Sequence, residues 1–343
     1  MVYGKHKIQS KLVLTTSCRW CYISNFTKKS NKDGLIMYMA KKVSIIIPSY
    51  KRADMLKKTI ESALKQTYQN TEIIVVDDNS PNSEDRISTE KVMNLYLKIK
   101  KIKYIKHSKN KNGSAARNTG IKHSTGDYIS FLDNDDEFLP DKIELQVKKL
   151  EELPNEYGIC YTKFIRRKSG KLIDRGVENR EGNLTREILM GTFYISSGSN
   201  MLLKRDVVLK IKGFNEKFQR RQDLEFLIRA SKITKIAHVN KVCLIINKDD
   251  RQNTFKNIWD LENNKRQYLE TFSDFIKELP LKDQEDIILS QSLLSSRYFI
   301  ERKKLRDLIK YNEENNISNL LQFKHIMYLV KRKLLKQCYG FNI

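Results

Sequence analysis

Residues 128–136 read Tyr-Ile-Ser-Phe-Leu-Asp-Asn-Asp-Asp, an apolar run followed directly by an acidic one. Its first part, Tyr128–Leu132, is rich in β-branched and aromatic side chains, which is typical of a buried strand. The next four residues, Asp133 to Asp136, include three carboxylates. Clustered carboxylates repel one another unless a divalent cation lies among them, and oxygen ligands suit Mg²⁺ or Mn²⁺. The alternative interpretation is a solvated acidic turn.

Strands and helices alternate around this stretch. Continuous apolar runs predict further buried strands at Val43–Ile47, Glu72–Val76 and Ile102–Ile105. Helices are expected between the strands, at Asp54–Gln66, around Val92–Ile99 and at Ala115–His123. This alternation predicts an α/β sheet with right-handed crossovers. In such sheets, ligands bind at the carboxyl ends of the strands.

Polar residues follow the predicted strands. The first strand ends in Pro48-Ser49-Tyr50 and the second in Asp77-Asp78. The Asp78 carboxylate can accept a hydrogen bond from a base or a ribose, although Asp-Asn-Ser also suits an Asx turn. The helix that carries Arg117 begins near Ser114, a candidate N-cap, and helix N-termini and arginines bind anions. An ordinary capped helix with a surface arginine is the alternative.

Asp223 is expected in the first turn of a helix whose apolar face includes Leu224, Leu227 and Ile228. A carboxylate beside an acceptor hydroxyl can act as a general base. A helix-terminal aspartate that complements the helix dipole is the other interpretation.

Composition sets limits on the function. The 343 residues are 40% hydrophobic, which suits a globular protein. No apolar run approaches the ~20 residues that span a bilayer, and the first ten residues do not resemble a signal peptide, so we expect a cytoplasmic protein. The net charge of +24 favours anionic partners. Cys18 and Cys21 form a C-x-x-C pair without a second ligand pair, which favours free thiols over a metal or redox site.

Three regions are expected. Residues 1–40 are a flexible basic extension, and a native start at Met37 or Met39 would remove most of it. Residues 41–257 form the α/β domain, and residues 258–343 form a mainly helical region. Near the end, apolar residues from Ile326 to Leu335 mix with lysines and an arginine. This pattern suits either a helix on an anionic membrane at the inner face or a helix packed on the domain.

Several motifs occur in an order that resembles the family 2 glycosyltransferases, which have a GT-A type fold. The motifs are residues 43–50 (VSIIIPSY), 75–80 (VVDDNS), 114–120 (SAARNTG), 126–136 (GDYISFLDNDD), 213–216 (GFNE) and 222–223 (QD). The resemblance covers roughly half of the chain and does not extend to its two ends.

The resemblance implies an inverting transfer of a sugar from a nucleotide diphosphate, with a UDP-sugar favoured, to a hydroxyl acceptor. Asp223 matches the catalytic base, Asp135 the direct metal ligand, and Asp133 a residue near the ribose or metal. The metal, Mn²⁺ or Mg²⁺, would stabilise the leaving diphosphate. The residues implied to bind the donor are Pro48, Ser49, Tyr50, Arg52, Asp78, Arg117, Asp133, Asn134 and Asp135. A glycan or lipid-linked acceptor of cell-surface glycan synthesis is expected.

The sequence departs from the family in three places. Gln222 stands where the family usually has Glu, residues 245–250 lack the family's downstream His, and no Gln-x-x-Arg-Trp motif of processive polymerases occurs. A catalytically inactive nucleotide-sugar-binding relative is therefore one alternative. A nucleotidyltransferase normally has a Gly-rich loop where this chain has Pro48 to Arg52. A nucleic-acid-binding protein would leave the strand-end acids unexplained, because they repel a phosphate backbone.

Overall fold

The computed structural model describes residues 27–30, 36–218, 221–248 and 257–343. The chain divides into two units, Met1–Ala40 and Lys41–Ile343. In the first unit, β1 (Thr27–Ser30) pairs antiparallel with β2 (Ile36–Met39), and the sequence did not predict these strands. The Cys18–Cys21 pair lies outside the described residues.

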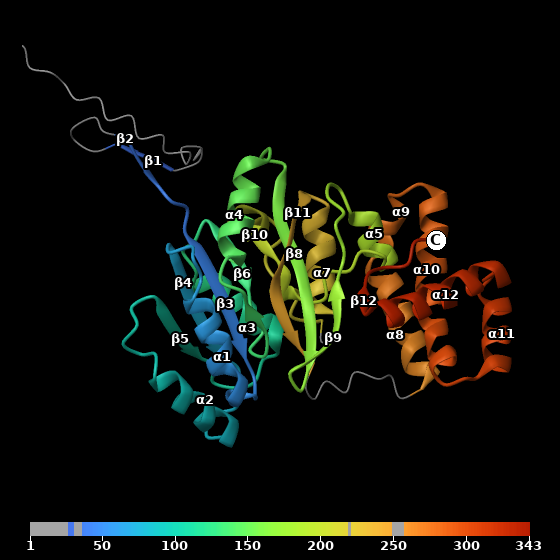
Figure 1. Cartoon of the computed structure of the whole chain (residues 1–343), viewed down its shortest axis with the longest axis horizontal. Helices are drawn as coiled ribbons and strands as arrows, with labels where there is room; N and C mark the ends of the chain where they lie inside the picture. The colour runs from blue at the N-terminus through green and yellow to red at the C-terminus, as the bar shows by residue number, and fades with distance from the viewer. Residues whose placement is uncertain (1–26, 31–35, 219–220, 249–256) are drawn as a thin grey trace, which may run out of the picture. The chain divides into compact units, whose positions relative to one another are not determined.

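One mixed sheet organises the second unit (Figure 1). Its main path runs in the order β12-β9-β8-β10-β6-β3-β4-β5, and β11 pairs with β8 and β7. Strands β6, β3, β4 and β5 are mutually parallel, whereas β10 is antiparallel to β6 and β8. The strands are β3 (Val43–Ser49), β4 (Thr71–Asp77), β5 (Ile102–Lys106), β6 (Tyr128–Phe131), β7 (Glu137–Phe138), β8 (Tyr157–Lys168), β9 (Lys171–Gly176), β10 (Leu202–Lys204), β11 (Lys235–Asn247) and β12 (Gln337–Cys338).

Helices pack on both faces of the sheet, and others form the C-terminal region. They are α1 (Ala53–Leu64), α2 (Glu84–Asn94), α3 (Gly113–His123), α4 (Lys142–Glu152), α5 (Thr185–Met190), α6 (Arg205–Lys210), α7 (Gln222–Ser231), α8 (Ile258–Thr271), α9 (Ser273–Lys277), α10 (Leu281–Glu301), α11 (Leu305–Glu314) and α12 (Asn319–Leu335). Helices α8 to α12 group together at one side of the sheet (Figure 1).

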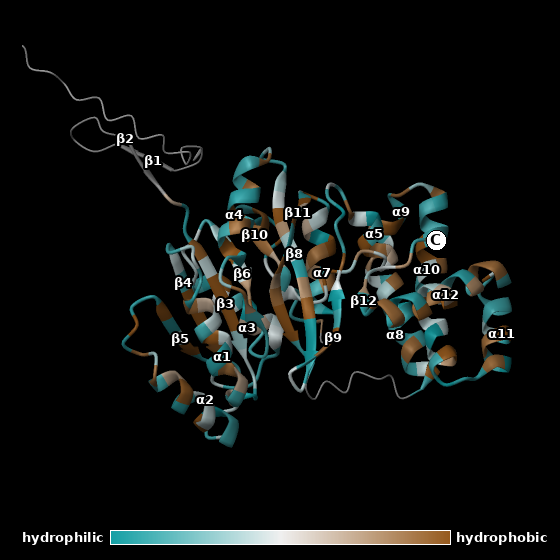
Figure 2. Cartoon of the chain, viewed as in Figure 1, coloured by the Kyte–Doolittle hydropathy of each residue, from teal (hydrophilic) through white to brown (hydrophobic). Residues whose placement is uncertain are grey.

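The parallel strands are hydrophobic on both faces because each face is covered. Hydrophobic residues run along β3 and β4 (Figure 2). Ile45 of β3 lies in the core cluster that includes residues of α1 and α4, whereas the next residue, Ile46, lies in the cluster that includes residues of α3 and α7. Gly120 lets α3 approach closely, since a Cβ there would lie 2.3 Å from Cγ2 of Ile46.

The strands predicted around residues 43–47, 72–76, 102–105 and 128–132 are confirmed, as is the mainly helical C-terminal region. The helix predicted around Val92–Ile99 is wrong: α2 ends at Asn94, and it begins after Ser83, whose Oγ accepts a hydrogen bond from the Arg86 amide. The sequence also missed β12, which pairs with β9 and joins the C-terminal region to the sheet. No helix among the described residues is long and apolar enough to cross a membrane.

Candidate functional site

A cavity of about 340 Å³ opens at the carboxyl ends of β3, β4 and β6. The parallel register brings Ser49 beside Asp77, so the residues that follow both strands meet at one edge of the sheet. Every residue that the resemblance implies for donor binding lines this cavity, namely Pro48, Ser49, Tyr50, Arg52, Asp78, Arg117, Asp133, Asn134 and Asp135. The structure therefore brings together side chains from positions as far apart in the sequence as Pro48 and Asp135.

Hydrogen bonds hold the Asp78 carboxylate in a fixed position. It accepts from Nδ1 of His107 at 2.7 Å, Nδ2 of Asn110 at 3.1 Å and the amide of Lys111 at 2.8 Å. Sequence reasoning missed His107 and Asn110, although both follow the third predicted strand, as the other site residues follow theirs. The preceding residue, Asp77, is fully buried and ties the turn to Arg86 through a 3.0 Å ion pair.

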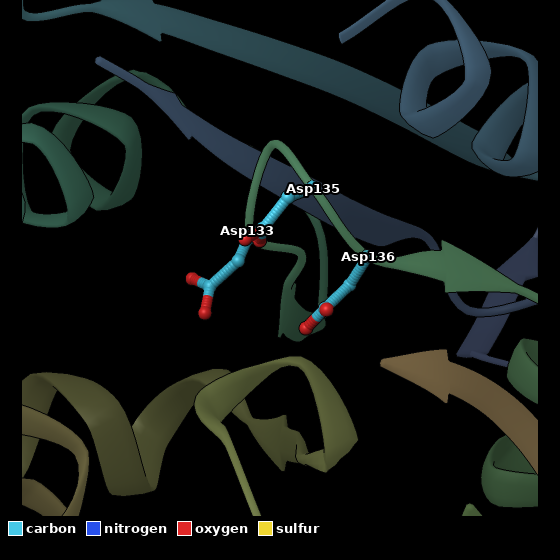
Figure 3. A group of neighbouring side chains, drawn as sticks. All are labelled: Asp133, Asp135 and Asp136. Atoms are coloured by element: carbon cyan, nitrogen blue, oxygen red, sulfur yellow. The ribbon is translucent and has the colours of Figure 1, made fainter. Parts of the chain in front are cut away.

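The acidic loop joins β6 to β7 and carries three aspartates (Figure 3). One carboxylate oxygen from each of Asp133, Asp135 and Asp136 lies within 4.8 Å of the others. Asp136 is fully buried and accepts hydrogen bonds from Oγ of Ser199 at 2.7 Å and of Ser197 at 3.2 Å. These bonds tie the acidic loop to the segment before β10.

Two arginines contact the other two acids. Arg52 forms an ion pair with Asp135, and Nη2 of Arg117 lies 2.6 Å from Oδ1 of Asp133. Asn247, at the end of β11, donates to the backbone oxygen of Asp135 at 2.8 Å. The sequence did not indicate a role for Asn247, because 112 residues separate it from Asp135.

Arg117 also links the acidic loop to α7. Its Nη1 donates to Oε1 of Gln222 at 3.0 Å, and its Nη2 lies 3.9 Å from Oδ1 of Asp223. A neutral Gln222 thus takes part in the network as a hydrogen-bond acceptor. The helix that carries Arg117 is capped by Asn112, whose Oδ1 accepts from the Ala115 amide. The prediction of Ser114 as the cap is wrong, because the helix begins at Gly113, two residues earlier than the predicted start at Ala115.

Asp223 lies in the first turn of α7, as expected, and its side chain is 34% exposed. Its Oδ2 accepts a hydrogen bond from the Gly198 amide at 3.1 Å. Asp223 also lines a second, larger cavity of about 450 Å³, together with Ser196 and Ser197. The Arg117–Asp223 contact therefore stands between two cavities.

Residues 44–212 match glycosyl transferase family 2. An uncharacterized glycosyltransferase of Rickettsia typhi is 31% identical over 257 residues, which cover 73% of this chain and 76% of that protein. The chain belongs to glycosyl transferase family 2. Three other Rickettsia relatives are 39–44% identical, but the matched region spans only 17–25% of their length.

A characterised relative of this family 2 chain is the GalNAc(5)-diNAcBac-PP-undecaprenol beta-1,3-glucosyltransferase of Campylobacter jejuni. It is 32% identical over 179 residues, 52% of this chain and 56% of that protein. Among solved structures, S. aureus TarS 1-349 in complex with UDP-GlcNAc superposes with a TM-score of 0.55 at 17% identity, covering 88% of this chain and 94% of TarS 1-349.

The mannosyltransferase PcManGT of Pyrobaculum calidifontis, in complex with GDP-Man and Mn²⁺, superposes with a TM-score of 0.52 at 12% identity and covers 91% of this chain and 90% of that one. The two structural matches confirm the GT-A type fold that the motifs implied.

Proposed function

We propose that the chain is an inverting glycosyltransferase. It moves a hexosyl or N-acetylhexosaminyl group from a nucleotide-diphosphate donor, with a UDP-sugar favoured, to a hydroxyl of a cell-surface glycan acceptor such as a capsule, lipopolysaccharide or teichoic-type polymer. The observation that carries the proposal is the Arg117 network, which joins the strand-end acids in one cavity to Asp223 in the next. The UDP-GlcNAc complex of TarS and the lipid-linked acceptor in the name of the Campylobacter jejuni relative support the substrate classes.

The smaller cavity is the donor site in this proposal. Asp78 accepts a hydrogen bond from the uracil-type base, since His107 and Asn110 already orient its carboxylate. Pro48, Ser49, Tyr50 and Asn134 line the same cavity and contact the nucleotide. Arg52 and Arg117 lie beside the acids, where they can bind the diphosphate with charge-assisted hydrogen bonds.

The acidic loop fits a divalent cation by its chemistry, because its donors are carboxylate oxygens clustered within 4.8 Å. Asp135 and Asp133 would hold Mn²⁺ or Mg²⁺, and the ion, when bound, would neutralise charge on the leaving diphosphate. Asp136 accepts hydrogen bonds from two serine hydroxyls, and its role is to hold the acidic loop in place. Arg52 forms an ion pair with Asp135, so the Arg52 guanidinium must move away when the Asp135 carboxylate binds an ion.

Asp223 is the general base in this proposal. The Gly198 amide donates to Oδ2 and so positions the carboxylate, which accepts the proton of the acceptor hydroxyl. The hydroxyl then attacks the anomeric carbon from the face opposite the diphosphate, so the configuration inverts. Arg117 lies near both Asp133 and Asp223, and its positive charge stabilises the ionised Asp223 carboxylate.

The test is a panel of nucleotide sugars with Mn²⁺, scored for thermal stabilisation of the chain and for release of the nucleotide diphosphate. A UDP-sugar should stabilise the protein, and Asp223→Asn should keep that stabilisation and lose transfer. If no nucleotide diphosphate or nucleotide sugar stabilises the chain, the proposal fails. Stabilisation without turnover by the wild type would instead favour the inactive nucleotide-sugar-binding relative.

We also propose that α12 places the enzyme on an anionic membrane at the inner face. Its buried side chains, Gln322, His325 and Tyr328, are polar or aromatic, so its inward face is not the apolar one. An apolar stripe at helical spacing faces solvent instead, made of Leu320, Phe323, Met327, Val330 and Leu334. Exposed Lys324 and Lys331 lie next to the stripe, an arrangement that suits a helix at an anionic lipid surface.

Sedimentation with vesicles tests the membrane proposal. The chain should sediment with phosphatidylglycerol vesicles and less with phosphatidylcholine vesicles, and replacing Phe323 and Val330 by serine should reduce binding at unchanged thermal stability. Binding to anionic vesicles that the double variant retains in full would show that α12 is not the contact. Dimers or trimers that the variant abolishes would assign the stripe to a second copy.

A further inference from the structure

We propose that the larger cavity beside Asp223 binds a phosphate group of the acceptor through Arg221, Arg297 and Arg332. The inference rests on the proposed glycosyltransferase function and names the acceptor class as phosphorylated. The three arginines line one cavity of about 450 Å³ with Asp223. They come from the residue before α7, from α10 and from α12, so only the tertiary fold brings them together.

None of these three arginines pairs with a carboxylate among the residues that the structure describes. Nε of Arg297 donates to Nε2 of His325 at 3.2 Å, and Arg332 donates to Oη of Tyr328 and Sγ of Cys338, both at 2.9 Å. Arg221 lies over the ring of Tyr268, 5.5 Å from its centroid. All of these partners are neutral, and His325 stays neutral because burial and the nearby Arg297 lower its pKa to about 3.

Three other partly buried arginines have carboxylate partners. Arg166 pairs with Asp174, Arg180 with Glu178 at 2.7 Å, and Arg229 with Glu225 at 2.6 Å. Removing a cation from water without an anion is unfavourable, and burial lowers the pKa of Arg297 accordingly. Arg297 and Arg332 are two such cations, and the exposed Arg221 lines the same cavity, so an anion that enters it stabilises the fold. We infer that the anion is part of the substrate.

A phosphate fits these groups better than a carboxylate does. One guanidinium group can donate two parallel hydrogen bonds to two oxygens of a phosphate. Arginines on three different segments of the chain can contact a tetrahedral anion from several sides. The donor diphosphate is not a candidate, because the donor cavity has Arg52 and Arg117 of its own. With its phosphate held by the arginines, an acceptor can present a hydroxyl to Asp223 on the wall of the same cavity.

The rest of the lining is compatible with two sources of the phosphate. Phe193, Leu294 and Tyr339 supply aromatic and aliphatic surface, which suits a polyprenyl chain or the face of a sugar. Arg221 and Arg297 also line an adjoining cavity of about 280 Å³, so the binding surface continues towards α10. A lipid-linked diphosphate and a polyol phosphate share the anionic group that the arginines recognise.

Calorimetry on the full chain tests the inference. Geranyl diphosphate and sn-glycerol 3-phosphate are titrated into the protein, with geraniol and glycerol as uncharged counterparts. At least one phosphate probe should bind, and Arg297→Gln and Arg221→Gln should each weaken that binding by about 10-fold or more, since each removes a charge-assisted hydrogen bond. Arg306→Gln is the matched control, because Arg306 is exposed on α11 and outside the cavity.

The outcomes separate this inference from the proposed function. UDP-sugar binding is measured in parallel, and it should be unchanged in both arginine variants. Preference for geranyl diphosphate supports a lipid-linked acceptor, and preference for glycerol phosphate supports a polyol phosphate. Failure of both probes to bind, equal binding of the uncharged counterparts, or equal weakening by Arg306→Gln would overturn the inference even if the UDP-sugar binds. Arg221→Gln keeps the test valid if Arg297→Gln does not fold, because Arg221 is solvent-exposed.

Discussion

Gly198→Ala provides the sharpest test of how the proposed base is positioned. A Cβ at residue 198 would lie 2.7 Å from Oδ1 and 3.1 Å from Cγ of Asp223, whereas ordinary van der Waals contact begins at 3.4 Å. The carboxylate would therefore move by about 0.7 Å, the difference between 3.4 and 2.7 Å. The movement would also weaken the 3.1 Å hydrogen bond from the Gly198 amide to Oδ2.

The size of the effect follows from this displacement. A misplacement of about 1 Å at a reacting group can cost about 100-fold in rate, so we expect kcat to fall by about 10- to 100-fold. Removing a general base costs about 100- to 10,000-fold, so Asp223→Asn should be the more damaging change. Donor binding should be unaffected, because Gly198 does not line the donor cavity.

A double-mutant cycle makes the prediction specific. Release of the nucleotide diphosphate is measured for the wild type, Gly198→Ala, Asp223→Asn and the double variant, with donor affinity measured by calorimetry. If Gly198→Ala acts by displacing Asp223, it should have little further effect in the Asp223→Asn background. Fully additive losses, or a loss of donor affinity equal to the loss of rate, would refute the reasoning.

Three further predictions follow from other contacts. Burial lowers the pKa of Lys142 from 10.5 to about 7, so between these pH values Lys142 is protonated in the unfolded chain and neutral in the folded one. The free energy of unfolding should therefore rise with pH over this range, by up to about 1.4 kcal/mol per pH unit. Urea titrations at several pH values should show this rise in the wild type and not in Lys142→Met. Arg52→Met should increase the affinity of the nucleotide-free chain for Mn²⁺, measured by electron paramagnetic resonance, because Arg52 competes for Asp135; unchanged affinity would contradict this. In Gly340→Ala the new Cβ would lie 1.5 Å from the backbone oxygen of Thr192, so the substitution should lower the free energy of unfolding by about 1–3 kcal/mol. The C-terminal segment should then become sensitive to limited proteolysis, and an unchanged digestion pattern would contradict this prediction.

The alternation of strands and helices was readable from the sequence because it depends on local hydrophobic periodicity. The apolar runs before Pro48, Asp77 and Asp133 are short and end in polar residues, so strand identity and the edge of the sheet at which the site lies could both be predicted. The helix around Val92–Ile99 was misplaced because the end of a helix depends on capping and turn contacts more than on composition.

The α/β class and the family motifs could be read from the sequence alone, because both follow from neighbours along the chain, and the resemblance to the family then implied the residues that line the donor cavity. Only the tertiary structure decided that Arg117 contacts Gln222, 105 residues away, that the Gly198 amide binds Asp223, and that Arg221 and Arg297 line the same cavity. These contacts join side chains from elements far apart in sequence, and they depend on how the helices pack on the sheet. No local pattern encodes them, since periodicity specifies which face of an element is buried but not which distant side chain it meets.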